Sequence, residues 1–154
     1  LEQALLNRAT EKFESDPEQA RRLLLKAVDI NPDGIQVRFQ LGLLHVGLEE
    51  YSRAIAFFEE VVRLDPSFAD SYFNLGYAYA MQKEFEKAES MYAKVVELAP
   101  YYLDEAFFNL AMVQEKEGKI RESILNLEQA MTVNPENPLI RKNLERLKTR
   151  MAKR

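Results

Sequence analysis

Hydrophobic residues recur every three or four positions along most of this chain, in stretches that short polar segments separate. This spacing is typical of amphipathic α-helices, whereas strands would show strict alternation. It predicts a first set of helices near 1–14, 35–48, 69–82 and 104–117, a second set near 17–30, 51–64, 85–98 and 120–133, and a ninth helix from Pro138. The pattern therefore predicts an all-α protein.

The chain also repeats itself. Four prolines close the similar phrases DINP, RLDP, ELAP and TVNP, at steps of 34, 34 and 35 residues. Small residues keep the same step, with Gly42, Gly76 and Ala111 in the first helices and Ala20, Ala54, Ala88 and Ser123 in the second. Small side chains let two helices approach closely, so each unit is expected to be a helical hairpin.

One unit carries an aromatic, Leu-Gly, Tyr, Ala, Tyr and Pro in a fixed order: Tyr72, Leu75, Gly76, Tyr79, Ala88, Tyr92 and Pro100. With these residues the chain resembles the tetratricopeptide repeat family over essentially all of its length. The resemblance implies one domain, a right-handed α-solenoid of four helix-turn-helix hairpins (1–34, 35–68, 69–103 and 104–137) and a capping helix, 138–154. The first unit departs from it, with Asn7 and Arg8 in place of Leu-Gly.

The resemblance further implies that the first helices line a concave groove. Their faces opposite the small residues carry an apolar set, Phe39, Leu43, Phe73, Tyr77, Phe108 and Met112. A contiguous exposed apolar strip usually marks a binding site. The residue before each signature leucine is an amide, namely Gln40, Asn74, Asn109 and, in the last helix, Asn143. Successive helices would then present a row of amides along the groove.

A side-chain amide offers both a donor and an acceptor, as an extended peptide backbone requires. Several members of the resembled family hold a peptide with such an Asn row, so the predicted function is a protein-interaction module that binds an extended peptide segment of a partner. Asp70 and Glu105 lie on the same face and favour basic residues in that peptide. The alternative, that the amides only solvate the groove or bond to a neighbouring helix, stays open.

Charge bears on other partners. The net charge is −4, but residues 138–154 hold seven basic residues against Glu145 alone. We expect this last helix to be a solvated cap that packs through Leu139, Leu144, Leu147 and Met151. Because the rest of the chain is acidic, nucleic acid is not an expected partner. No apolar run is long enough to cross a bilayer, so membrane insertion is not expected.

Candidate chemistry is sparse. With one histidine and no cysteine, neither a metal nor another cofactor is predicted, and His45 occupies a packing position. No phosphate loop or nucleophile motif is present, so an enzyme is not expected. The basic residues of a carboxylate clamp are absent too, which argues against a chaperone-tail ligand. Self-association of repeats and recruitment within a larger protein remain alternatives, since a chain that begins with Leu1 is expected to be a piece of something longer.

Overall fold

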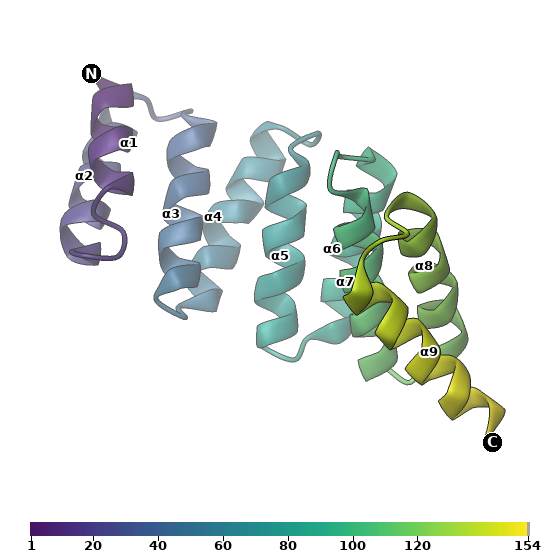
Figure 1. Cartoon of the computed structure of the whole chain (residues 1–154). Helices are drawn as coiled ribbons and strands as arrows, with labels where there is room; N and C mark the ends of the chain where they lie inside the picture. Colours follow the sequence, from purple (N-terminus) through teal and green to yellow (C-terminus); the bar gives the residue numbers. More distant parts are fainter. Residues whose placement is uncertain (154) are drawn as a thin grey trace. The chain divides into compact units, whose positions relative to one another are not determined.

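Helices account for nearly all of the chain, as the hydrophobic spacing predicts. The computed structural model describes residues 1–153. Over that range it contains nine α-helices and no strand: α1 (Glu2–Thr10), α2 (Pro17–Ile30), α3 (Ile35–Gly47), α4 (Tyr51–Leu64), α5 (Ala69–Met81), α6 (Phe85–Leu98), α7 (Leu103–Lys116), α8 (Ile120–Val133) and α9 (Pro138–Ala152) (Figure 1). The chain forms two compact units, residues 1–78 and 79–154, and α5 spans their boundary.

Short-range signals in the sequence fix where the helices begin. Asp16 caps α2 by accepting a hydrogen bond from the backbone N–H of Gln19 at 2.9 Å. Asn137 caps α9 in the same way, accepting from the backbone N–H of Leu139 at 3.0 Å. A proline follows each cap at the first helical position, where its missing N–H breaks no helical bond. Eight of the nine described helices begin and end within about two residues of the expected bounds.

The exception is α1, which was expected to reach residue 14 and ends at Thr10. Beyond it, the N–H of Lys12 donates to the carbonyl of Ala9 at 2.9 Å and that of Phe13 to the carbonyl of Thr10 at 3.3 Å. These bonds span three residues instead of four and tighten the chain out of the α-helix. The turn is needed because Asp16 must reach a non-helical conformation to cap α2.

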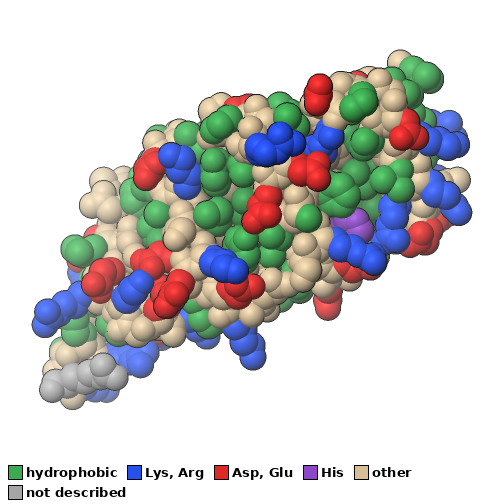
Figure 2. Space-filling view, turned by 180° about the vertical axis from the view of Figure 1, so that it is seen from behind, with side chains coloured by type: hydrophobic (Ala, Val, Ile, Leu, Met, Phe, Trp, Pro, Cys, Tyr) green, Lys and Arg blue, Asp and Glu red, His purple; other side chains and the backbone are tan. Residues whose placement is uncertain are grey.

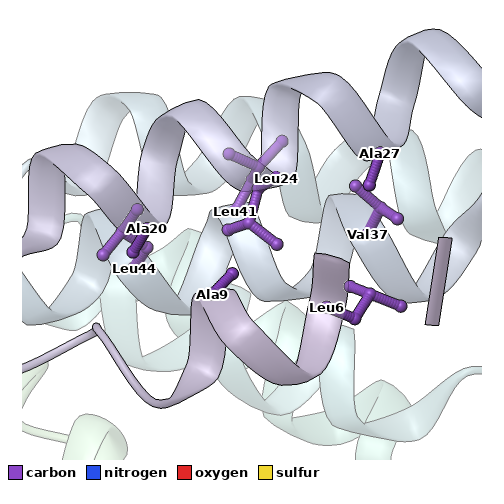
Figure 3. Close-up of a cluster of buried hydrophobic side chains, with 8 residues drawn as sticks. All are labelled: Leu6, Ala9, Ala20, Leu24, Ala27, Val37, Leu41 and Leu44. Carbon is purple, nitrogen blue, oxygen red and sulfur yellow. The ribbon is translucent and has the colours of Figure 1, made fainter. Parts of the chain in front are cut away.

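In the first unit, α1, α2 and α3 share one core. Ala20, Leu24 and Ala27 of α2 pack among buried side chains of the two flanking helices (Figure 3). These neighbours are Leu6 and Ala9 of α1 and Val37, Leu41 and Leu44 of α3. Alanine at positions 20 and 27 is completely buried, so the small residues keep the helices close, as the sequence predicts.

In the second unit, α7, α8 and α9 share another core. Ala111 of α7 and Leu127 of α8 are fully buried in it. Ser123, which takes the place of the alanine of other repeats, donates from Oγ to the carbonyl of Ala111 at 2.7 Å. A hydroxyl is tolerated there because its hydrogen bond is satisfied.

The packing stripe of α9 differs from the expected one. Ile140 and Leu147 are the buried residues of this helix, whereas Leu139 is 52% and Met151 46% exposed. The prediction was therefore wrong at Leu139 and Met151. Helical spacing is satisfied by Ile140 in place of its neighbour Leu139, and the rotation of α9 against α8 buries Ile140. Met151 keeps the spacing of this stripe but lies in the last turn of the helix, where it remains exposed.

The turns within three of the hairpins, α3–α4, α5–α6 and α7–α8, share one conformation, which the α1–α2 turn does not adopt. Glu49, Lys83 and Gly118 occupy the same repeat position, and each has a positive φ, of 58°, 63° and 81° respectively. The next residue donates its N–H to a carbonyl five positions earlier in each turn, as Lys119 does to Gln114 at 2.9 Å. Only one of these turns uses glycine, the residue for which a positive φ carries no steric cost.

Candidate functional site

The predicted site residues divide between the two units. Gln40 and Asn74 lie in the first unit, and Asn109 and Asn143 in the second. All four amides are partly buried. Each group is described within its own unit.

In the second unit, three predicted site residues line one hollow. Glu105, Phe108 and Asn109 of α7 border a cavity of about 280 Å³. The cap and first turn of α9 also line it, with Asn137, Leu139 and Ile140. The hollow thus combines an amide, an aromatic ring, an exposed leucine and an exposed carboxylate. This is a chemically mixed set of the kind that small binding sites use.

A comparison between repeats explains why this hollow is open. Phe39 of α3 corresponds to Phe108 of α7, and its ring packs at 5.1 Å, centroid to centroid, against Phe68. Phe68 lies two residues after a repeat proline, and Asn137 holds the same position in the last repeat. The smaller, polar Asn137 turns its carboxamide to the N-terminus of α9, so it borders the ring of Phe108 without covering it as Phe68 covers Phe39.

The same comparison corrects the expectation for Phe39. This side chain was expected on the groove face, but it is only 8% exposed. Its ring lies 5.6 Å from that of Phe58 in addition to its contact with Phe68. The ring is large enough to reach both α4 and the following loop, which removes it from solvent. Phe39 therefore belongs to the core and is not an accessible anchor.

The remaining first-unit residues keep some exposure. Tyr77 is 39% exposed, and its ring packs edge-on against that of Tyr51 at 6.3 Å. Asn74 donates from Nδ2 to the backbone carbonyl of Asp70 at 2.8 Å, within the same helix. This bond uses one N–H of the amide and fixes its orientation, while Asp70 itself is exposed. Phe73 and Gln40 are partly buried.

Leu43 lines a different hollow, which lies in the first unit at the first hairpin. This cavity of about 350 Å³ is bordered by Phe13, Glu14 and Pro17 before and at the start of α2, and by Leu43, Leu44, Gly47 and Leu48 at the end of α3. Its walls are mostly apolar, and Glu14 contributes a carboxylate to them.

Asn143 lies outside the second-unit hollow, and its amide is already bonded. Its Nδ2 donates to the carbonyl of Leu139 at 2.9 Å, and its Oδ1 accepts from the guanidinium of Arg146 at 2.9 Å. Arg146 also binds both carboxylate oxygens of Glu115, at 2.6 and 2.7 Å. The guanidinium lowers the pKa of Glu115, and that carboxylate raises the pKa of Arg146. Asn143 thus supports an ion pair that holds α9 to α7.

Two further polar clusters connect neighbouring hairpins. In the first unit, Glu50 accepts from Arg21 and pairs with His45, whose Nδ1 lies 2.6 Å from the carboxylate. The hydrogen bond with His45 is the main cause of the lowered pKa of Glu50. His45 stacks on Phe57 and is 4% exposed, in agreement with a packing role. Figure 2 shows only a small purple patch of it, with basic side chains beside it.

In the second unit the charges of this cluster are exchanged. Lys119 takes the position of Glu50 and pairs with Glu89 of α6. Gln114 takes the position of His45 and donates to Glu89 at 2.9 Å. Burial acts to raise the pKa of Glu89, but the bonds from Lys119 and Gln114 outweigh it and lower that pKa. These groups are paired with one another and serve to join helices.

Several residues of the two hollows were not predicted. Asn137 and Leu139 were not predicted as site residues because the last helix was expected to act only as a cap. The Asn-Pro pair before the leucine does signal a helix start at a surface. Phe13 and Glu14 were not predicted as site residues because their segment was expected to be helical. Within residues 1–153, no helix has the length and apolar character required to cross a membrane.

Comparisons with known proteins agree with this architecture. Two family models, both described as tetratricopeptide repeat, match residues 13–66 and 39–102 and residues 104–137. A comparison with curated protein sequences finds no match to this chain.

Solved structures share the fold at low sequence identity. A structure of MamA from Desulfovibrio magneticus RS-1 has a TM-score of 0.88 at 20% identity, over 98% of this chain and 85% of that one. The pilF protein of Pseudomonas aeruginosa has a TM-score of 0.86 at 19% identity, over 99% and 69%. The TPR domain of Arabidopsis OM64 has a TM-score of 0.69 at 19% identity, over 75% and 94%. The predicted all-α solenoid is thereby confirmed.

Proposed function

Because this chain belongs to the tetratricopeptide repeat family, we propose that it is a protein-interaction module that binds an extended peptide segment of a partner protein through its first helices. The observation that carries the proposal is the hollow of about 280 Å³ that borders Glu105, Phe108 and Asn109 together. These residues were selected from the sequence for three separate reasons, namely charge, exposed apolar surface and amide chemistry. Their convergence on one hollow supports a common ligand.

The amide of Asn109 is the group that would hold the peptide backbone. Its Oδ1 accepts a peptide N–H, and its Nδ2 donates to a peptide carbonyl. A backbone that enters the hollow loses water and must regain both bonds, since unpaired buried groups cost about 1–3 kcal/mol each. Asn74, whose orientation is fixed by Asp70, would do the same in the first unit.

The apolar contacts would come from side chains that are only partly covered. Phe108 and Leu139 face the second-unit hollow, and Tyr77 offers an exposed ring in the first unit. Met112 packs on the second-unit core beside Phe108 and would support that ring. Phe39 takes no part because it is buried.

Charge selects the kind of peptide. Glu105 and Asp70 are exposed acids, so basic residues in the ligand are favoured and a C-terminal carboxylate is repelled. Asp104 also borders the second-unit hollow, but its carboxylate accepts from Asn134 at 2.8 Å and is partly committed. A carboxylate-clamp ligand is therefore not proposed. No catalytic role is proposed either, since the clustered carboxylates are engaged in joining helices.

A binding array tests the proposal. Immobilised random dodecapeptides are probed with the labelled protein and with three variants: Asn109→Ala, Asn74→Ala/Asn109→Ala and Gln129→Ala. Gln129 is an exposed amide on α8 and serves as the matched control. We expect a subset of peptides to bind, with roughly tenfold weaker binding for Asn109→Ala, a larger loss for the double variant and no change for Gln129→Ala.

Two results would oppose the proposal. Equal binding by all the variants would remove the amides from the mechanism. Absence of any peptide binding, together with a dimer in light scattering that Asn109→Ala disrupts, would favour the self-associating scaffold instead.

A further inference from the structure

The hollow at the first hairpin is bordered by Leu43, which the sequence predicts on the groove face, and by none of the residues named for the proposed function. It lies between the turn that follows α1 and the last turn of α3. Phe13 and Leu48 close it on two sides and pack against the first-unit core, and Leu44, only 2% exposed, forms part of that core. The hollow is thus anchored to rigid packing and is not a surface irregularity.

The early end of α1 creates this hollow. If α1 continued to residue 14, Phe13 would lie on a helix. Instead the three-residue turns at Lys12 and Phe13 bring that ring to the edge of α3. Gly47 leaves the opposite side open, because a Cβ added there would meet no atom within 4 Å. A volume of about 350 Å³ is enough for one bulky side chain and too small for a helix.

The charge of the rim identifies the neighbours of that side chain. Residues 11–18 contain four acidic residues against Lys12. Asp16 caps α2 and Glu18 pairs with Arg21, which leaves Glu14 on the wall of the hollow and Glu11 near it in the chain. Both Glu11 and Glu14 are exposed. An apolar socket with an acidic rim is complementary to an apolar side chain with basic neighbours.

We propose that this hollow is an anchor subsite that takes one leucine-sized or aromatic side chain of the partner peptide, with lysine or arginine beside it. The inference rests on the proposed function, because it names the sequence class of the same ligand. Burial supplies the affinity of the anchor, and Glu14 supplies the preference for basic neighbours. Helix α3 would then contact the peptide through Leu43 and Gly47 at its C-terminal half.

Two fluorescein-labelled peptides test the subsite, one with the core Lys-Lys-Leu-Lys-Lys and one with Lys-Lys-Ala-Lys-Lys, both flanked by Gly-Ser. Fluorescence anisotropy measures their dissociation constants. The wild type is expected to bind the Leu peptide about tenfold more tightly than the Ala peptide, because a leucine buries more apolar area. Gly47→Leu fills the hollow and should abolish this ratio, whereas Gly47→Ala, which adds one carbon, should keep most of it.

Glu14 is tested separately. Glu14→Gln should weaken both peptides equally and reduce the salt dependence of binding, while the Leu-to-Ala ratio stays unchanged. If Glu14→Gln binds with the same salt dependence as the wild type, the acidic rim does not contribute to the preference for basic neighbours. Replacement of glycine in a helix raises helical propensity, so a loss caused by Gly47→Leu would not be due to unfolding; thermal unfolding of each variant verifies this.

The outcomes separate the two proposals. Equal binding of the Leu and Ala peptides by the wild type, or a Leu preference that survives Gly47→Leu, overturns the anchor subsite. Asn74→Ala, which removes the proposed backbone-holding amide of the same unit, should weaken both peptides and keep their ratio; if it leaves both unchanged, the proposed role of the amide fails while the anchor stands. Light scattering could instead show that the wild type is a dimer and that Gly47→Leu is a monomer. That result would assign the hollow to a second copy of the chain and would also overturn the inference.

Discussion

The ring of Phe58 on α4 lies directly against the backbone of Gly42 on α3. A Cβ added to Gly42 would lie 2.4 Å from Cε1 of that ring, far inside van der Waals contact. Phe58 is completely buried and cannot move into solvent. The smallest residue on one helix and a large ring on the other therefore set the spacing of the two helices in this hairpin.

Gly42→Ala should destabilise the protein by about 1–3 kcal/mol through overpacking, even though alanine is the better helix former. Urea unfolding monitored by circular dichroism measures the change. Gly47→Ala is the matched control on the same helix, and we expect it to stabilise the protein by about 0.5–1 kcal/mol because its Cβ meets no neighbour. Equal effects of the two substitutions would show that Phe58 does not constrain the spacing.

Gly118 allows a second stability test that involves the backbone alone. Its φ is 81°, and a Cβ added there would meet no atom within 4 Å. Gly118→Ala should therefore cost about 1 kcal/mol through the left-handed conformation, with no contribution from packing. The unfolding midpoint should fall without a change in the denaturant slope. An unchanged midpoint would mean that this turn adopts another conformation.

The agreement between Gly42 and its expected role shows how much of the fold is local. Repeat spacing, small residues and proline positions predict the helices to within about two residues, because each acts on a single hairpin. The limit of α1 was missed since it depends on how Asp16 caps the next helix. The packing side of α9 was missed because its stripe is decided by rotation against α8.

The ion pair between Glu115 and Arg146 predicts an acid-dependent stability. The guanidinium lowers the pKa of Glu115 in the folded protein below its ordinary value of 4.5. The contribution of this pair is therefore fully present above pH 4.5 and is lost as the pH falls through the lowered folded pKa. Its size should be about 1 kcal/mol or less, since Arg146 is well exposed.

Urea midpoints of the wild type and Glu115→Gln at several pH values between 3 and 7 measure this effect. The two curves should differ above pH 4.5 and converge at the acid end. Arg146→Gln should reproduce most of this difference, and a remainder is expected because Arg150 also contacts Glu115 at 3.4 Å. A constant difference across the whole range would show that Glu115 acts through packing and not through its charge.

The candidate site was predicted in part. Glu105, Phe108 and Asn109 share one hollow, whereas Phe39 is buried and Asn143 is bonded to Arg146. Repeat position tells which helix face a residue occupies, but not whether a neighbour covers it. Whether the ring is covered depends on the loop after the repeat proline. Phe68 packs on Phe39 there, whereas Asn137 at the equivalent position borders a hollow together with Phe108.

Side-chain amide resonances test peptide capture most directly. The ¹⁵N-labelled protein is titrated with the tightest peptide selected on the array, and the NH₂ groups of Asn74, Asn109 and Gln129 are followed. Peptide capture predicts saturable shifts for Asn74 and Asn109 with one common dissociation constant, and no shift for Gln129. Saturation of binding while the Asn109 resonances stay in place would contradict the role of the amide in holding the peptide backbone.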